Sequence, residues 1–370
     1  MVKIAEELKR IVMYVDESEK EKTKDIKNNI FSLLASYPKA LIADAYSYQI
    51  NYLESYIPEN AHLAYMTYTV AEEIIQLSFT ENYGEYWPDD FGAEPIKSDP
   101  VSDNPEGMAA FSSRGPTLDG RIKPDVVAPG TNILSVRSCR ATDDGWGLPA
   151  DEELRKYYMY MGGTSMATPI AAGSVALIRQ YLMNVRGQAG PSSALLKAVL
   201  IHGAVSMKGQ YDAAHPDTNP VPDSVNQGWG RIDMKSALTP TPPVKVEFRD
   251  NPEDAVGSFE QVEYDFSVED SSVPFKATLV WTDFPCKLPA VGLVNRLLLS
   301  VKLPEGDQLL SAQAGSNNNV HQVVINKPRA GKYTVIVEGI GIAEGISAEK
   351  IKDMDLKQDF ALVISGGLKE

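Results

Sequence analysis

The most informative stretch of the chain is Met161-Gly162-Gly163-Thr164-Ser165-Met166-Ala167-Thr168-Pro169. It predicts a turn that delivers a serine to the start of an apolar helix, because Gly162 and Gly163 accept backbone angles that a Cβ forbids and allow a substrate to approach closely. Pro169 suits a helix start, where backbone N–H groups lack intrahelical acceptors. Ser165 would then lie where those N–H groups and the helix dipole favour a developing oxyanion. Alternatively, Ser165 only caps a core helix, and the pattern alone leaves both interpretations open.

Two apolar helices are expected in this region. The first begins at Ser165, and the second covers roughly 192–203 with Ser192 or Ser193 as its N-cap. Short β-type runs and Gly/Pro turns precede these helices, so residues 79–239 are interpreted as an α/β region.

The C-terminal third has a different texture. A stiff linker containing Pro240, Pro242 and Pro243 comes first, and apolar residues then alternate as they do in half-buried strands. Such alternation predicts strands at 244–248, 262–266 and 333–337. Residues 244–368 are therefore predicted to form a separate all-β antiparallel sandwich.

The N-terminal segment, residues 1–78, is predicted to be a helical leader, because its apolar residues recur at helical spacing. We expect its amphipathic helices to pack on the α/β region and cover the edge of an incomplete sheet. The first residues are charged and contain no apolar signal-peptide core, so the sequence as written gives no address for secretion.

Composition excludes several classes of protein. The 370 residues are 43% hydrophobic and 23% charged, which is typical of a globular protein. The net charge of −15 disfavours nucleic-acid and anionic membrane partners. The sequence contains no run of eighteen consecutive apolar residues, so it predicts no membrane-spanning helix. Cys139 and Cys286 belong to no zinc or redox motif.

The stretch from Gly163 to Pro169 resembles the nucleophile motif of the subtilisin-like serine proteases, the subtilases. Further motifs of that family follow the same order at Phe111–Pro116, Lys123–Thr131 and Gln227–Ile232, and the likeness continues at Leu279–Asp283 and Gly292–Asn295. This resemblance covers roughly residues 80–365 and points to the branch with a C-terminal β-sandwich. It implies a partial subtilisin-like parallel sheet with helices before the sandwich.

The resemblance also implies an activity, the hydrolysis of peptide bonds through an acyl-enzyme on Ser165. Gly163, Thr164, Met166 and Pro169 would support the nucleophile as members of its motif. Peptides or proteins are the implied substrates. Subtilases are often secreted, but the localisation of this chain stays open.

Three parts of the subtilase machinery are absent from the sequence. It contains neither the Asp-Ser/Thr-Gly motif, nor His-Gly-Thr/Ser, nor the Ala-Gly-Asn motif of the oxyanion donor. Of the four histidines only His62 precedes Ser165, and it is a weak candidate for the general base, with Asp44 a still weaker carboxylate partner. His202 is interpreted as a core residue. The chain is therefore expected to be nearly inert alone, with Asp and His supplied by a partner chain or another segment.

No metal or other cofactor is expected. The segment Leu293–Leu298 resembles a calcium-binding run of related sandwich domains, but Arg296 and Leu298 replace its carboxylates. The acidic clusters Asp143-Asp144 and Asp151-Glu152-Glu153 lack the spacing of a calcium loop and are interpreted as solvated surface. The alternative to a protease is a non-catalytic pseudo-protease or interaction module, which the missing motifs favour. A carbohydrate-binding sandwich would rest on fold analogy alone.

Overall fold

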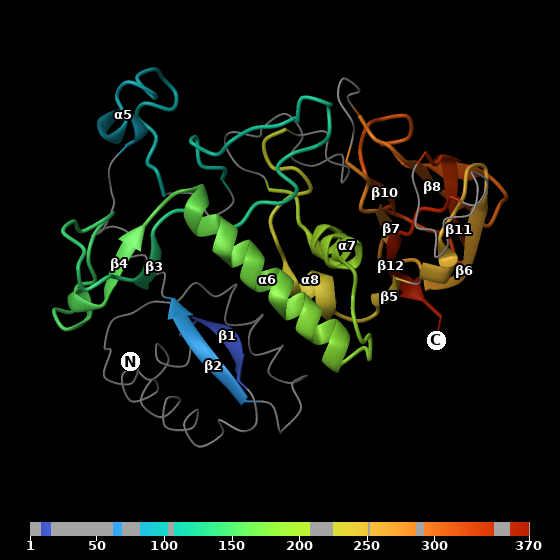
Figure 1. Cartoon of the computed structure of the whole chain (residues 1–370), viewed down its shortest axis with the longest axis horizontal. Helices are drawn as coiled ribbons and strands as arrows, with labels where there is room; N and C mark the ends of the chain where they lie inside the picture. The colour runs from blue at the N-terminus through green and yellow to red at the C-terminus, as the bar shows by residue number, and fades with distance from the viewer. Residues whose placement is uncertain are drawn as a thin grey trace. The chain divides into compact units, whose positions relative to one another are not determined.

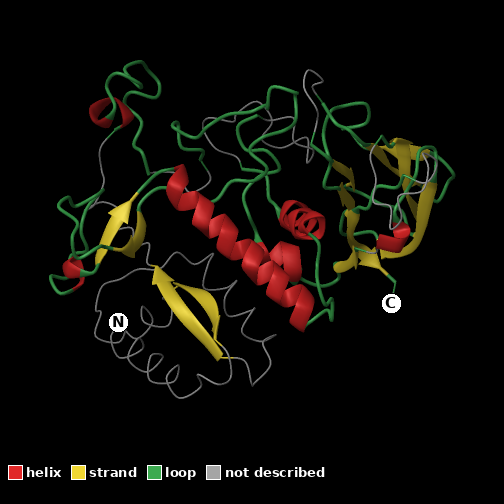
Figure 2. Cartoon of the chain, viewed as in Figure 1, coloured by secondary structure: helices red, strands yellow, loops and turns green. Residues whose placement is uncertain are grey.

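The computed structural model describes residues 9–15, 62–68, 82–102, 107–207, 225–250, 252–285, 292–343 and 356–369 (Figures 1 and 2). The chain divides into two compact units, which are considered separately. The first unit is built mainly from residues up to 112 and from 128–173. The second contains 113–127, 174–208 and the C-terminal region from 212. Neither unit contains, within these ranges, a helix of the length and apolarity needed to cross a bilayer.

Short elements and one long helix form the first unit. In chain order these are β1 (Lys9–Val15), β2 (His62–Tyr68), α5 (Tyr83–Tyr86), β3 (Ile133–Val136), the 3-10 turn η2 (Leu154–Lys156), β4 (Tyr158–Met161) and α6 (Thr164–Asn184), which continues into the second unit. β1 pairs with β2, and β3 pairs with β4, both antiparallel. A small hydrophobic core in this unit consists of Tyr83, Val101, Trp146 and Tyr160.

The prediction of a helical leader is wrong at two segments. Residues 9–15 and 62–68 form an antiparallel ladder in which Val15 lies opposite His62. The helical spacing of apolar residues gave the wrong prediction because both segments are rich in β-branched and aromatic residues, which favour strands. Their structure also depends on pairing with a distant segment, which spacing within one segment does not reveal. The rest of residues 1–78 lies outside the described residues.

The second unit contains the C-terminal part of α6, two further helices and the β-strands that follow them in the chain. Its elements are α7 (Ser193–Gly203), α8 (Met234–Leu238), β5 (Lys245–Arg249), η3 (Pro252–Asp254), β6 (Gln261–Asp270), β7 (Phe275–Val280), β8 (Arg296–Lys302), β9 (Gln308–Leu310), β10 (Val320–Ile325), β11 (Gly331–Gly341) and β12 (Ala361–Leu368). The predicted cap of α7 is confirmed, because the Ser192 hydroxyl accepts the N–H of Leu195 at 3.0 Å.

Eight strands form one sheet in the order β10-β7-β12-β6-β11-β8-β9, with β5 paired to β12. Every ladder is antiparallel, which confirms an all-β antiparallel region after the linker. The strands are continuous through β12, which pairs with β7 along Ala361–Ser365 and with β6 at Gly367 and Leu368 after a bulge. The sandwich prediction implied two separate sheets and did not anticipate this continuity.

Alternate residues of the strands fill one core. On β7 the buried side chains include Phe275, Ala277 and Leu279, and the same two-residue spacing recurs on β8 and β11. α7 packs on β7 and β12, where His202 is 4% exposed. Its Nδ1 lies 2.9 Å from the Thr278 hydroxyl and its Nε2 lies 2.8 Å from the Ser365 hydroxyl. The interpretation of His202 as a core residue is confirmed.

The predicted parallel sheet is not assembled in the described part of the chain. The described ladders before residue 245 are antiparallel, and parallel pairing is limited there to an isolated bridge between Val127 and Arg231. Arg231 also bridges Val205 in the antiparallel sense. Parallel strands need partners from distant segments, and in the described part of the chain before residue 245 such pairing amounts to this one bridge.

Candidate active site

Ser165 is the second residue of α6 and its side chain is exposed. The predicted serine at a helix start is therefore confirmed to within one residue. In the described part of the structure, neither the Ser165 hydroxyl nor its N–H has a hydrogen-bond partner. An unpaired N–H at the positive end of a helix favours a nearby anion, and the exposed hydroxyl of Ser165 lies beside it.

The turn before α6 has a fixed backbone. Gly163 adopts a φ of 135°, which strongly favours glycine. Its N–H donates to the carbonyl of Gly130 at 2.7 Å, and its own carbonyl accepts the N–H of Met166 at 3.0 Å. The turn thus joins the Gly130 segment to the helix and determines where Thr164 and Ser165 begin.

Two other family-like motifs meet in the second unit. The N–H of Val127 donates to the carbonyl of Gly230 at 2.9 Å, and the N–H of Ile232 donates back to Val127 at 3.0 Å. Gly228 has a φ of 59°, and a Cβ there would collide with the carbonyl oxygen of Pro124. Backbone hydrogen bonds therefore join the Lys123–Thr131 motif to the Gln227–Ile232 motif. The close approach of Pro124 explains why Gly228 has no side chain.

Comparison with known proteins decides the family. The model of the "Subtilase family" peptidases matches residues 19–230, which is more than half of the chain. The chain belongs to the subtilase family. The match begins inside residues 1–78, which the resemblance found in the sequence did not cover, so part of this leader aligns with the family.

Individual relatives agree with this assignment. The chain is 32% identical over 319 residues to the "Serine protease/ABC transporter B family protein tagB" of Dictyostelium discoideum, covering 68% of this chain and 16% of that protein. It is 49% identical over 80 residues to "Serine protease AprX" of Bacillus subtilis, covering 22% of this chain and 18% of that protein. This subtilase chain therefore spans less than a fifth of the length of either relative.

The structure describes some of the other expected site residues but not all of them. Thr164 and Met166 lie in the first turn of α6 as expected, and the Thr168 hydroxyl donates to the Thr164 carbonyl at 2.9 Å. Pro169 lies deeper than predicted, as the sixth residue of the helix, where a proline supplies no N–H to the Ser165 carbonyl. His62 is the first residue of β2, and its side chain lies outside the described part of the structure. Asp44 and His215 lie outside the described residues altogether.

The two remaining histidines of this subtilase are buried in the β-rich unit. His321 is 2% exposed, and its Nδ1 lies 2.9 Å from the Ser311 hydroxyl. Burial lowers the pKa of His321 to about 4. For His202, burial and then the charge of Lys276 hold the pKa well below its usual value. Both rings are therefore neutral structural groups.

Asn132 is a residue that sequence reasoning missed. It is 2% exposed, and neither its amide nitrogen nor its amide oxygen has a hydrogen-bond partner among the described residues. Its φ of 51° is left-handed, a conformation that Asn tolerates better than most residues. Ile133 pairs with Met161, so Asn132 flanks the turn at Gly162.

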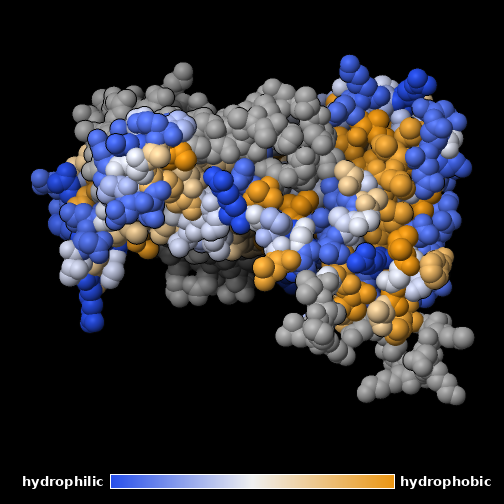
Figure 3. Space-filling model, turned by 90° about the horizontal axis from the view of Figure 1, so that it is seen from above, coloured by the Kyte–Doolittle hydropathy of each residue, from blue (hydrophilic) through white to orange (hydrophobic). Residues whose placement is uncertain are grey.

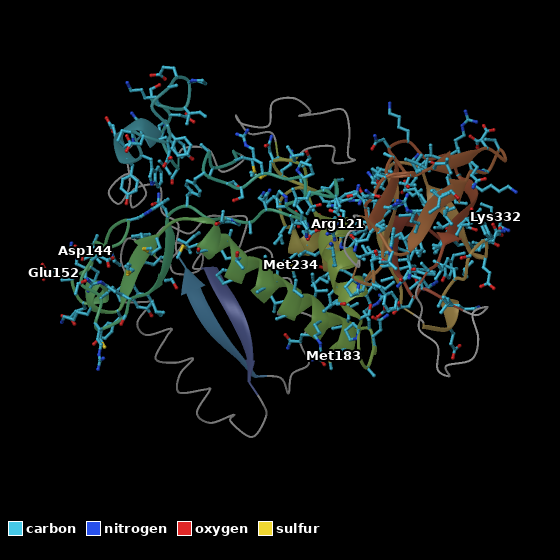
Figure 4. All side chains as sticks on the ribbon, turned by 45° about the horizontal axis from the view of Figure 1, so that its top comes forward. Arg121, Asp144, Glu152, Met183, Met234 and Lys332 are labelled. Atoms are coloured by element: carbon cyan, nitrogen blue, oxygen red, sulfur yellow. The ribbon has the colours of Figure 1, made fainter. Side chains whose placement is uncertain are left out.

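The suspected metal segments of the subtilase have structural roles. Asp283 accepts the N–H groups of Val294 and Asn295, both at 2.8 Å, and the Arg296 guanidinium donates to the Asn317 side chain at 3.1 Å. Among the described residues, no group of three His, Cys, Asp or Glu side chains could hold a metal ion. Asp144 and Glu152 of the acidic clusters are exposed, as Figure 4 shows.

Asp125 in the Lys123–Thr131 motif lies between two lysines. Its carboxylate bonds to Lys197 Nζ at 2.8 Å and is also paired with Lys123. Burial alone would raise the pKa of Asp125, but the charges of Lys197 and Lys123 lower it below its ordinary value. Lys197 gave no signal in the sequence, because it lies on α7, far along the chain from Asp125.

We predict that Asp125→Asn destabilises the chain by about 1.5–3 kcal/mol at pH 7, because it removes hydrogen bonds between charged groups and leaves Lys197 without its carboxylate. Urea unfolding measures this change. The matched control is Asp144→Asn, which breaks a pair with Arg137 in which the carboxylate is exposed, and it should cost about 1 kcal/mol or less. Equal losses in the two variants would contradict this account of Asp125.

Proposed function

We propose that this chain is the nucleophile-bearing part of a subtilase-type serine endopeptidase. Ser165 Oγ attacks the carbonyl carbon of a peptide bond, the amine of the cleaved bond leaves, and water then releases the acyl group. The Ser165 N–H donates to the oxyanion that develops on the carbonyl oxygen. The observation that carries this proposal is the exposed Ser165 at the start of α6, with its hydroxyl and N–H unpaired within the described part.

The proton of the serine needs an acceptor. An imidazole held by a carboxylate takes that proton and returns it to the leaving amine in this family. His202 and His321 are buried and bonded to hydroxyl groups, so neither is offered for this role. The base is therefore His62 or, as we favour, a histidine on another segment or a partner chain that also brings the Asp and the oxyanion Asn.

A non-catalytic interaction module is the second candidate. The absent Asp and His motifs favour it directly. Hydrophobic surface is also visible between hydrophilic groups on the β-rich unit (Figure 3). Phe259 in that unit is 83% exposed and has a φ of 63°, which is unusual for a bulky residue. An aromatic side chain presented in this way is suited to contact with another protein.

Casein hydrolysis separates the two candidates. We expect the purified chain to cleave casein at a rate near the buffer blank. Addition of a subtilase segment that carries the Asp, the His and the oxyanion Asn should raise the rate, because the Asp and His of this family lie N-terminal to its serine. Casein cleavage by the chain alone would refute its dependence on a partner. No cleavage with or without that segment, or with an extract of the source cells, would favour the interaction module.

A further inference from the structure

The indole of Trp146 lies directly against Gly162, the first glycine of the turn before Ser165. A Cβ built on Gly162 would overlap three atoms of the six-membered ring of Trp146. The side chain is 8% exposed, so this contact is buried. Sequence reasoning assigned Gly162 to the close approach of a substrate, but the structure fills that space with an aromatic ring of the chain itself.

Backbone bonds hold Trp146 in this position. Its N–H donates to the carbonyl of Tyr160 at 2.8 Å, and the N–H of Tyr160 donates to Gly147 at 2.8 Å. Tyr160 also pairs with Leu134, so β4 has β3 along one edge and residues 146–147 along the other. The loop that carries Trp146 is thus a third strand-like segment attached to the strand that leads into the turn.

Three aromatic side chains pack against the indole of Trp146. The ring centroids of Tyr86, Trp87 and Phe111 lie 6.4, 6.1 and 6.2 Å from that of Trp146, all in edge-to-face arrangements. Contacts of this kind stabilise packing beyond the burial of area alone. Tyr86, Trp87 and Phe111 are therefore connected to the turn at Gly162 through the indole of Trp146.

We propose that Trp146 is a positioning residue for Ser165. The turn is restrained at Gly163 by its hydrogen bond to Gly130 and at Gly162 by the indole. Only two residues lie between Gly162 and Ser165, a span of at most about 10 Å even in an extended chain. Displacing the ring frees the turn and moves the hydroxyl that it presents. The expected effect on catalysis rests on the proposed function of Ser165 as the nucleophile. The restraint of the turn rests only on the contacts of Gly162 and Gly163.

Hydrogen exchange of the full chain tests the restraint without activity. We expect Trp146→Ala to speed exchange of the amides at 163–168 on the order of tenfold, because local opening becomes easier. Trp146→Phe keeps an aromatic ring at Gly162 and should restore most of the protection. The control is Phe91→Ala, which removes a ring that contacts Tyr83 and Trp87 of the same cluster. Unchanged exchange in Trp146→Ala, or equal acceleration in Phe91→Ala, would overturn the proposal.

The catalytic consequence has its own measurement. In the chain supplied with its missing groups, Trp146→Ala should slow fluorophosphonate labelling of Ser165 on the order of a hundredfold, since about 1 Å of misplacement has that effect. Trp146→Phe should recover most of the rate, and Phe91→Ala should retain it. A normal rate in Trp146→Ala would refute the positioning role. If unmodified Ser165 is never labelled, the proposed function fails, and the exchange experiment alone decides whether the indole restrains the turn.

Discussion

The Ser165→Ala chain should have no measurable peptidase activity under conditions in which the unmodified chain cleaves casein. In subtilisin, removal of the nucleophilic serine lowers turnover about a millionfold, and the same chemistry is expected at Ser165. The substitution should barely change stability, because the side chain is exposed and without a hydrogen-bond partner among the described residues. The loss would therefore be chemical, and casein assays of the folded variant measure it.

A neighbouring hydroxyl on the same helix provides the control. Thr168 is also exposed, and its hydroxyl donates to the Thr164 carbonyl rather than facing a reaction. Thr168→Ala should keep activity within a fewfold of the unmodified chain. Retained casein cleavage in Ser165→Ala, with a normal unfolding midpoint, would show that another group acts as nucleophile and would contradict the proposed function.

Acid should destabilise the β-rich unit well above the range of ordinary carboxylates. His321 has a usual pKa of 6.5, and burial lowers it in the folded chain to about 4. Between these values the unfolded chain binds the proton and the folded chain does not, so stability falls as pH falls from about 6.5 toward 4. For His321 alone this amounts to about 2 kcal/mol between pH 7 and pH 5. His202, also buried and neutral, acts in the same direction.

Urea unfolding of the full chain at pH 7 and pH 5 measures the effect. His321→Gln removes the titrating ring while keeping a polar side chain near Ser311, so its stability should change less between the two pH values. Histidine signals in NMR spectra should also show one ring titrating near pH 4. A pH dependence that is the same in the unmodified chain and in His321→Gln would contradict this assignment.

Local chemistry explains which parts were predictable. The turn at 162–163, the start of α6 and the Ser192 cap of α7 depend on residues adjacent in sequence, and each was placed within a residue or two. The strands β5, β6 and β11 were also found, because alternation within a strand reports its buried face.

Interactions between distant residues explain what was missed. The indole of Trp146 meets Gly162 only because residues 146–147 pair with β4, and Lys197 meets Asp125 only after α7 has packed. The β1–β2 ladder likewise joins segments far apart in the chain. Helical spacing in one segment cannot reveal a partner strand elsewhere, so the leader was assigned the wrong secondary structure there.

Fluorophosphonate labelling followed by peptide mapping tests the central claim most directly. Trypsin should release residues 157–179 as one peptide, which contains Ser165. With the complementing segment present, we expect one adduct per chain on Ser165 of that peptide, and almost none without the segment, because the hydroxyl then lacks an oriented imidazole. An adduct on any other residue, or no adduct with the segment bound, would contradict the assignment of Ser165 as the nucleophile of this subtilase.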